Sequence, residues 1–347
     1  MTREAESSLP ISVVIMCFNR RKFLVQSVNS VLQQTLSRDK YEILVTKNFE
    51  DNDIDLFLSQ NGIFSILEED VNIGTMIVNA ISRARGEYIS FLDDDDIFYP
   101  DKLSTIFKAI TSIPGLVYYH NAFDTIDSDS LKIDDYRHRH PRSQIILREG
   151  NTHTTLRTVK PLSGDINMSS ITVRRDLLTK YAQHIKNIDG LQDVFIFYLS
   201  VLSGGELLLD SLVTTGYRIH TSESHGDLED FENYSSGIRN VLKKYLKSYE
   251  ILMTIRDNTL TDLRYEYLTN KCRYELMLPH REGILTIKEL FYLLLHLGNA
   301  EGLGNQFFLI VLSFMHAVMP GRISDFYIHM KMRLDSSKYS RQTGVST

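Results

Sequence analysis

The segment from Tyr88 to Leu103, with the sequence YISFLDDDDIFYPDKL, constrains this chain more than any other. It begins with an apolar run typical of a buried strand, continues with four consecutive aspartates, Asp93 to Asp96, and resumes a helical pattern after Pro100. Adjacent carboxylates raise the free-energy cost of ionising one another, so a positive group is expected opposite them. A divalent cation with oxygen ligands would meet that need, and Mg²⁺ is commonly held by one or two carboxylates together with substrate phosphates.

Two interpretations of the aspartate quartet are open from these residues alone. Acidic side chains just before a helix stabilise its N-terminus and can cap its free N–H groups, and Asp96 or Asp101 could serve only that purpose. The position of the quartet favours a ligand site instead. It follows a strand in a series of alternating strands and helices, and open α/β sheets bind ligands at the carboxyl ends of their strands.

Apolar segments alternate with amphipathic ones along the first part of the chain, which predicts an α/β fold with a mostly parallel sheet flanked by helices. Ile11 to Phe18 is apolar on both faces, as expected of a central parallel strand. The helix that begins after Asn72 is expected to end at Gly86, a residue favoured in the left-handed cap position. Further strands are expected at residues 41–45, 63–67, 88–92, 116–119, 168–173, 207–209 and 213–219, and further helices at 176–181 and 193–202. Residues 124–158 are polar and irregular in pattern, which is typical of a functional or mobile stretch.

After about Asp227 helical periodicity dominates, which predicts a helical C-terminal region over residues 227–340 beside a first domain over residues 10–226. The apolar run Phe307 to Met319 is too short to span a bilayer. A packed helical cap is the favoured interpretation, because Ser313 and His316 interrupt the apolar face. Contact with a membrane surface is the alternative, because a basic tail follows: Lys331, Arg333, Lys338 and Arg341.

Composition excludes several other classes of protein. The formal net charge of −6 argues against a general nucleic-acid binder. Cys17 and Cys272 are far apart and lack metal-ligand spacing, which is consistent with a reducing compartment. Residues 1–10 lack the basic and apolar segments of a signal peptide. We therefore expect a cytoplasmic protein, with peripheral contact at the inner face of a membrane as an open alternative.

Several motifs in order resemble those of the family 2 glycosyltransferases, inverting enzymes with the GT-A fold. A strand followed by a Tyr-Asn-Arg-like turn, then Ser-x-Leu-x-Gln and Asn-x-Gly, opens that family's pattern. The next motifs are an Ala-x-Gly-Glu-Tyr-Ile-x-Phe-Leu-Asp segment and Pro-x-x-Leu. The last two are a small-residue turn that precedes a strand ending in Arg-Arg, and a Tyr-Arg-x-His segment. The matching residues here are 18–20, 30–34, 72–74, 84–93, 100–103, 164–175 and 217–220. The resemblance covers about residues 10–225 and implies a Rossmann-like nucleotide-binding domain.

The resemblance implies roles for the aspartates around a nucleotide-sugar. Asp95 corresponds to the metal ligand of the DxD motif, with Asp93 beside it and Asp94 near the ribose. The implied cofactor is Mn²⁺ or Mg²⁺, which would neutralise the departing diphosphate. His220 is a further candidate metal ligand, and Arg218 a candidate contact of the diphosphate.

The resemblance also implies contacts to the rest of the donor. The loop from Met16 to Arg20 would pass under the nucleotide with Phe18 against the base, and Asn72 and Gly74 belong to the donor motif. The family usually has two aspartates after its second strand, where this chain has Lys47 and Asn48. Asn48 is the candidate base contact, and uracil and guanine both stay open because an amide can donate and accept hydrogen bonds.

Inversion requires a general base on the acceptor side, which the family supplies from a Glu-Asp pair at the start of a helix. The matching pair here is Gln192-Asp193, so Asp193 is the predicted base and Gln192, with Gly164, a predicted acceptor contact. Asp193 could equally cap its helix. Gln192 contributes no charge, which leaves the class of acceptor open.

The sequence therefore predicts a metal-dependent hexosyltransferase-type enzyme that moves a sugar from a UDP- or GDP-linked donor to an acceptor hydroxyl in polysaccharide, glycan or glycolipid synthesis. The expected partners are the donor and a saccharide or lipid-linked acceptor, with no nucleic acid. One alternative is a sugar nucleotidyltransferase, which would be expected to have a glycine-rich loop where Cys17 to Arg21 has no glycine. The other is a catalytically degenerate scaffold, which is favoured by Lys47 and Gln192 at positions where the family has acidic residues.

Overall fold

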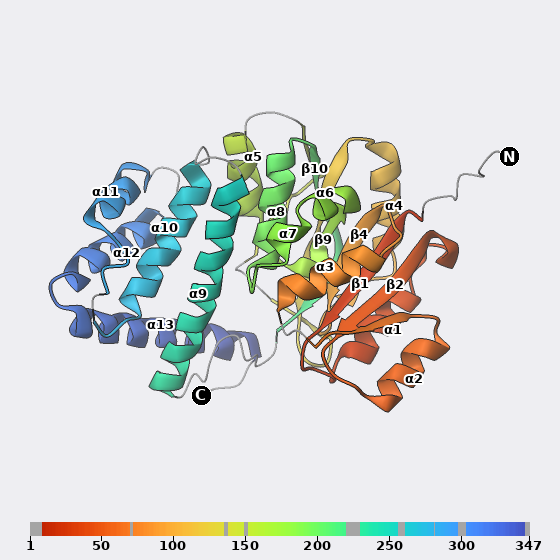
Figure 1. Ribbon diagram of the computed structural model, residues 1–347, viewed down its shortest axis with the longest axis horizontal. Coiled ribbons are helices and arrows are strands. Elements are labelled where there is room, and N and C mark those ends of the chain that lie inside the picture. Colours follow the sequence, from red (N-terminus) through yellow and green to blue (C-terminus); the bar gives the residue numbers. More distant parts are fainter. Residues whose placement is uncertain are drawn as a thin grey trace. The chain divides into compact units, whose positions relative to one another are not determined.

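The computed structural model describes residues 9–69, 72–134, 138–148, 152–219, 230–255, 261–280, 282–297 and 303–343. The chain divides into two compact units, residues 1–219 and 220–347 (Figure 1). The predicted domain boundary at residues 226 and 227 lies outside the described residues.

One mixed sheet organises the first unit, with the strand order β3-β2-β1-β4-β9-β6-β10-β5. The parallel pairs are β1 with β2 and β4, β2 with β3, and β6 with β10, while β9 is antiparallel to both of its neighbours. The strands are β1 Ile11–Cys17, β2 Tyr41–Lys47, β3 Phe64–Leu67, β4 Tyr88–Asp93, β5 Ile97–Phe98, β6 Leu116–Ile126, β7 Lys132–Ile133, β8 Ile145–Leu147, β9 Ile171–Arg174 and β10 Glu206–Arg218. The expectation of an α/β fold with a mostly parallel sheet is confirmed.

Helices cover both faces of this sheet, as the apolar character of β1 on both faces requires. Every residue of β1 is buried, and Ile11, Val13 and Ile15 pack in one core with α1, α2 and α4. Helices α3, α6, α7 and α8 lie together on the other side (Figure 1). The helices are α1 Leu24–Leu32, α2 Asn52–Gln60, α3 Ile73–Arg83, α4 Lys102–Ser112, α5 Thr152–Val159, α6 Arg175–Lys180, α7 Ala182–Ile185 and α8 Gln192–Ser203.

Three local expectations were wrong. Gly86 is not left-handed, and α3 ends at Arg83 with Ala84 as its C-cap. A Cβ on Gly86 would lie 2.3 Å from the backbone nitrogen of Ser12, so the role of this glycine is close packing on β1. Residues 168–170 form a 3₁₀ turn ahead of β9 rather than the start of a strand. The polar stretch 124–158 contains the end of β6, β7, β8 and α5 within its described part.

The second unit is helical, with α9 Phe231–Ile255, α10 Thr261–Leu276, α11 Ile287–Leu295, α12 Leu303–His316 and α13 Pro320–Thr343. Two apolar clusters hold it together, one around Tyr234 and Leu276 and the other around Cys272 and Leu293. Thr286 and Glu289 form a capping box that fixes the start of α11. Among the described residues no helix combines the length and hydropathy needed to cross a bilayer.

Candidate functional site

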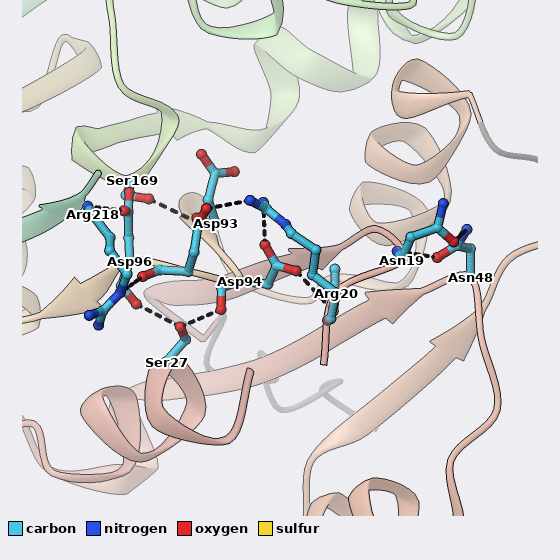
Figure 2. A network of polar contacts seen from close by, with 11 residues as sticks. Asn19, Arg20, Ser27, Asn48, Asp93, Asp94, Asp96, Ser169 and Arg218 are labelled. Atoms are coloured by element: carbon cyan, nitrogen blue, oxygen red, sulfur yellow. Dashed lines mark hydrogen bonds and ion pairs between the residues drawn. The ribbon is translucent and has the colours of Figure 1, made fainter. Parts of the chain in front are cut away.

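The predicted donor residues meet where β1, β2 and β4 end. Met16 lies opposite Asp93 on one side and Thr46 on the other, and Cys17 lies opposite Lys47. The carboxyl ends of these parallel strands therefore place the loop after β1, the residues after β2 and the aspartate quartet at one edge of the sheet (Figure 2). Such an edge is where open α/β sheets bind ligands.

Arg20 stands opposite the aspartates. Its two terminal nitrogens lie 2.6 Å from Asp94 Oδ1 and 2.5 Å from Asp95 Oδ2. Burial opposes the positive charge of Arg20, but the carboxylates of Asp95, Asp94 and Asp93 outweigh burial and raise the pKa of the guanidinium. In this structure the positive group that the quartet requires is therefore an arginine.

The carboxyl groups of Asp93 and Asp94 resist ionisation. Burial, and then the charges of Asp95 and Asp94, raise the pKa of Asp93 well above its ordinary value. Burial raises the pKa of Asp94 to about 6, although Arg20 opposes that shift. Two neighbouring carboxyls that are expensive to ionise are a typical feature of a functional site, because a cation or a proton must compensate them.

Asp96 has a different position from the other three aspartates. It is buried, its Oδ1 accepts the N–H of Arg218 at 2.7 Å, and its Oδ2 has no hydrogen-bond partner. Burial, and then the charges of Asp95 and Asp93, raise its pKa well above the ordinary value. Ser27 Oγ donates to the backbone oxygens of Asp94 and Asp96 at 2.9 and 2.6 Å (Figure 2). Through its Oδ1, Asp96 therefore joins the turn to the end of β10.

The residues fit a divalent cation only in part. No group of three or more His, Cys, Asp or Glu side chains is arranged to hold a metal within the described part of the chain. Asp93 and Asp95 nevertheless offer carboxylate oxygens, which are the ligands that Mg²⁺ and Mn²⁺ prefer. The Asp95 carboxylate contacts Arg20 through Oδ2, so a cation bound by Asp95 would lie close to the positive charge of the guanidinium.

Asn19 and Asn48 join the loops after β1 and β2. The backbone N–H of Asn19 donates to Asn48 Oδ1 at 2.8 Å, and Asn48 Nδ2 donates to Asn19 Oδ1 at 2.9 Å (Figure 2). Phe18 beside them is exposed, so a flat ligand could reach its ring. Lys47 is buried; its Nζ donates to the backbone oxygen of Phe49 at 2.6 Å and lies 2.9 Å from Asp55.

Three further predicted donor and acceptor residues have structural explanations of their own. Asn72 caps α3, because its Oδ1 accepts the N–H of Thr75 at 3.0 Å. A Cβ on Gly74 would lie 2.0 Å from the backbone oxygen of Ile185. A Cβ on Gly164 would lie 2.7 Å from the side chain of Leu209. Their ligand roles stay predictions.

Arg218 ends β10 and holds several loops together. Its Nε donates to the backbone oxygen of Asp95 at 2.6 Å, and its Nη1 donates to the backbone oxygens of Asp127 and Ser128. Its Nη2 donates to Gln26 and Ser130. A contact between this guanidinium and a diphosphate would require several of these bonds to be exchanged. His220, the other predicted residue of this segment, lies outside the described residues.

Asp193 lies in the first turn of α8, beside Gln192. Its Oδ2 accepts the N–H of Asn167 at 3.1 Å and its Oδ1 that of Val194 at 2.8 Å. Burial raises the pKa of Asp193 to about 6, and its charge in turn contributes to the raised pKa of Asp93. Asp193 is thus electrostatically coupled to the aspartate quartet and has a pKa near neutrality, which suits a general base.

The sequence did not predict the buried lysine, Lys102, beneath the turn that connects Asp93 with Asp193. Lys102 is fully buried, and its Nζ donates to Asn121 Oδ1 at 2.5 Å, the backbone oxygen of Ser169 at 2.7 Å and Thr215 Oγ1 at 2.9 Å. Ser169 Oγ accepts the N–H of Asp93 at 2.9 Å (Figure 2). The turn at Asn167–Ser169 therefore contacts both Asp93 and Asp193. A lysine near a helix N-terminus resembles an exposed residue, so the sequence carried no signal for this role.

The model of the family described as "Glycosyl transferase family 2" matches residues 12–181. An uncharacterized glycosyltransferase of Nostoc sp. is 27% identical over 232 residues, which cover 62% of this chain and 67% of that protein. The glycosyltransferase GlyG of Streptococcus pneumoniae is 31% identical over 124 residues, 34% of this chain and 41% of that protein. A crystal structure of S. aureus TarS 1-349 in complex with UDP-GlcNAc is similar in fold, with a TM-score of 0.51, 14% identity and coverage of 89% of this chain and 92% of that one. The similarity to TarS concerns the fold alone. The match to the family model, in agreement with the strand-end aspartates and the motifs around them, assigns residues 12–181 of this chain to glycosyl transferase family 2.

Proposed function

We propose that the protein transfers a sugar from a nucleoside-diphosphate sugar to an acceptor hydroxyl with inversion, assisted by Mn²⁺ or Mg²⁺. The observation that carries this proposal is the coupled set of carboxyl groups at one sheet edge. Asp93, Asp94 and Asp193 all have raised pKa values, and Arg20 faces the first two. Several carboxyl groups with raised pKa values in one place are more typical of a catalytic site than of a packed core.

On the donor side, Asp93 and Asp95 would hold the cation, and Asp94 would lie near the ribose. When bound, the cation supplies charge compensation for the diphosphate as it leaves. Arg20, released from Asp95, would add a second positive group beside the diphosphate. Arg218 and His220 are proposed to close over the diphosphate, with His220 near the cation.

The nucleotide would lie over the loop after β1. We propose that Met16 supports it, that Phe18 contacts the base and that Asn48 reads the base through the amide now paired with Asn19. Asn72 and Gly74 complete the donor side. The bound UDP-GlcNAc of TarS makes UDP-linked sugars the first donors to test, and GDP-linked sugars the second.

On the acceptor side, Asp193 would accept the proton of the attacking hydroxyl. The acceptor oxygen then forms a bond to the anomeric carbon from the face opposite the diphosphate, while the bond from that carbon to the phosphate oxygen breaks. Asn167 fixes the Asp193 carboxylate through its backbone N–H. Gly164 and Gln192 are proposed to line the acceptor, a saccharide or lipid-linked saccharide used in polysaccharide, glycan or glycolipid synthesis.

A degenerate scaffold is the competing function. Two residues favour it: Lys47, which contacts Phe49 and Asp55, and Gln192, which has no charge. The raised pKa values at Asp93 and Asp193 speak against it, because a protein without catalysis gains nothing from them.

Thermal unfolding with a panel of nucleotides separates these functions. A ligand that binds only the folded protein raises Tm by mass action. At a concentration one hundred times its Kd, it increases the free energy of unfolding by about 2.7 kcal/mol. We expect one of UDP, GDP or dTDP, or its sugar conjugate, to raise Tm only when Mn²⁺ or Mg²⁺ is present. If no nucleotide raises Tm with either metal, the scaffold is favoured and the donor site is wrong.

A further inference from the structure

The second unit exposes apolar side chains on two adjacent helices. Ile287, Phe291 and Leu295 recur every fourth residue of α11, and Leu295 is 82% exposed. On and just after α12 the exposed apolar side chains are Leu303, Phe307, Phe308, Val311, Met315, Val318 and Met319. We call these ten residues the apolar face. Such a concentration of exposed apolar groups marks an interaction site rather than ordinary surface.

The two rows form one surface. The rings of Phe291 on α11 and Phe314 on α12 are 6.0 Å apart between centroids, in an edge-to-face arrangement. Phe314 lies one helical turn from Val311 and two from Phe307, on the same side of α12. The other side of α12 is turned inward, where Leu309, Ile310 and Leu312 are buried. The apolar face therefore lies on the side of α12 opposite to the side that packs in the core of the second unit.

The chemistry of the face points to lipid rather than protein. The face consists of Leu, Ile, Val, Met and Phe, and it lacks tyrosine, tryptophan and arginine, the residues that contribute most binding energy in protein interfaces. The sequence from Leu303 to Gly321 has no Asp, Glu, Lys or Arg. An amphipathic helix of this kind lies in the plane of a membrane interface with its apolar side chains in the acyl region.

Charge at the ends of the face indicates which lipid. In the described parts of α11, α12 and α13, the exposed charged side chains are Lys288, Arg322, Asp325 and Arg333, three cations and one anion. Arg322 lies in the first turn of α13, four residues after Val318, and Phe326, also exposed, follows Arg322 by one helical turn. Cations beside inserted apolar groups favour anionic headgroups, each by about 1 kcal/mol near such a surface.

We infer that the apolar face of α11 and α12 docks the protein onto the surface of a bilayer that contains anionic lipid. Lys288, Arg322 and Arg333 then lie at headgroup level while Phe291, Leu295, Phe307 and Val318 enter the acyl boundary. This inference deepens the peripheral membrane contact expected for a lipid-linked acceptor, and it stands on the second unit alone.

Flotation of the full-length protein with vesicles tests the inference. We expect binding to phosphatidylcholine vesicles that contain phosphatidylglycerol and weaker binding to pure phosphatidylcholine. The double variant Leu295→Glu/Phe307→Glu should reduce binding on the order of tenfold or more, because charges in the acyl boundary are costly. Arg322→Gln/Arg333→Gln should remove the preference for phosphatidylglycerol. The matched control is Phe64→Glu/Leu212→Glu, which places the same charges at positions of the first unit exposed to 54% and 53%.

Three results would overturn the inference. Failure of the unmodified protein to float with either vesicle would do so. Equal loss of binding in the control double variant would show that any exposed apolar residue serves. An oligomer in light scattering that Leu295→Glu/Phe307→Glu dissociates, without flotation, would assign the face to a second copy of the chain. The nucleotide-dependent rise in Tm, measured on the same variants, reports their folding and keeps the membrane result separate from the donor site.

Discussion

Arg20 joins Asp94 and Asp95 through its two terminal nitrogens, although 74 and 75 residues separate it from them along the chain. The same Asp95 carboxylate is the proposed ligand of the divalent cation. Arg20 and the cation would therefore bind the same carboxylate, where their like charges disfavour each other unless a diphosphate lies beside them. This relationship makes metal binding and donor binding interdependent.

Arg20→Gln should separate the two binding events. Without the guanidinium, Asp95 is available to a cation, so we expect Mn²⁺ to bind more tightly than in the unmodified protein when no nucleotide is present. The nucleoside diphosphate should bind more weakly, by about 1–3 kcal/mol, because a charge-assisted contact is lost. Calorimetric titration measures both. Arg21→Gln, which removes an ion pair with Asp51 beside the site, is the control; unchanged Mn²⁺ affinity in Arg20→Gln would contradict the competition.

Asp193→Asn should lose activity, and its stability relative to the unmodified protein should depend on pH. Loss of a general base lowers kcat by about 10²–10⁴ while donor binding persists. In the unmodified enzyme, kcat/KM should rise with pH through about 6 as the Asp193 carboxyl ionises. Full activity in Asp193→Asn would remove this residue from the mechanism.

The stability of the same variant depends on pH with a definite sign. The pKa of Asp193 is about 6 in the folded protein, above its ordinary value of 3.8. Burial of the ionised carboxylate therefore destabilises the fold above pH 6, whereas below about pH 4 the group is protonated in both states. The Tm of Asp193→Asn minus that of the unmodified protein should thus increase between about pH 4 and pH 6 and stay constant above pH 6. Asp53→Asn, at an exposed position of α2, should show no such growth.

Lys102→Met tests the support beneath the site. The substitution removes three hydrogen bonds and leaves Asn121 Oδ1 and the backbone oxygen of Ser169 without this donor. We expect a loss of about 2–4 kcal/mol in the free energy of unfolding, measured by urea titration, since buried polar groups are left unsatisfied. Lys108→Met, on the exposed side of the same helix, should change it by less than about 0.5 kcal/mol. Equal losses of stability in Lys102→Met and Lys108→Met would show that the buried hydrogen bonds of Lys102 do not stabilise the fold.

Gly74→Ala distinguishes packing from donor contact. The added Cβ would lie 2.0 Å from the backbone oxygen of Ile185 and 2.8 Å from that of Ile188, so the two segments must separate. We expect a fall in Tm from a loss of about 1–3 kcal/mol or more. Gly115→Ala, whose Cβ would contact only Glu206 at 3.4 Å, is the matched control. A variant with unchanged Tm but weaker nucleotide binding would show that Gly74 serves the donor instead.

Much of the fold and of the donor side could be predicted from sequence because both follow from strand ends. β1, β2 and β4 are apolar, so their limits are visible in the sequence, and parallel pairing then brings Arg20, Asn48 and the aspartates together. The antiparallel position of β9 was not predictable, because the choice of a partner strand is a property of the whole sheet.

Other features had no local signal. The burial of Lys102 depends on Asn121 and Thr215, which are distant in sequence. The closeness of Gly86 to β1 and of Gly74 to residues 185–188 depends on packing between elements. The resemblance to the family predicted Asp193, and the structure adds the Asn167 N–H that orients it. The metal, the base that is read and the acceptor stay predictions.

Binding of Mn²⁺ to the unmodified protein and to Asp95→Asn, followed by electron paramagnetic resonance with and without UDP or GDP, tests whether Asp95 and a nucleoside diphosphate together hold a cation. We expect the signal of free Mn²⁺ to fall further when protein is added to Mn²⁺ and one nucleoside diphosphate. Asp95→Asn should abolish this further fall, while its Tm without ligand stays near that of the unmodified protein. Equal loss of free Mn²⁺ signal in the unmodified protein and in Asp95→Asn would contradict a cation held between Asp95 and the diphosphate.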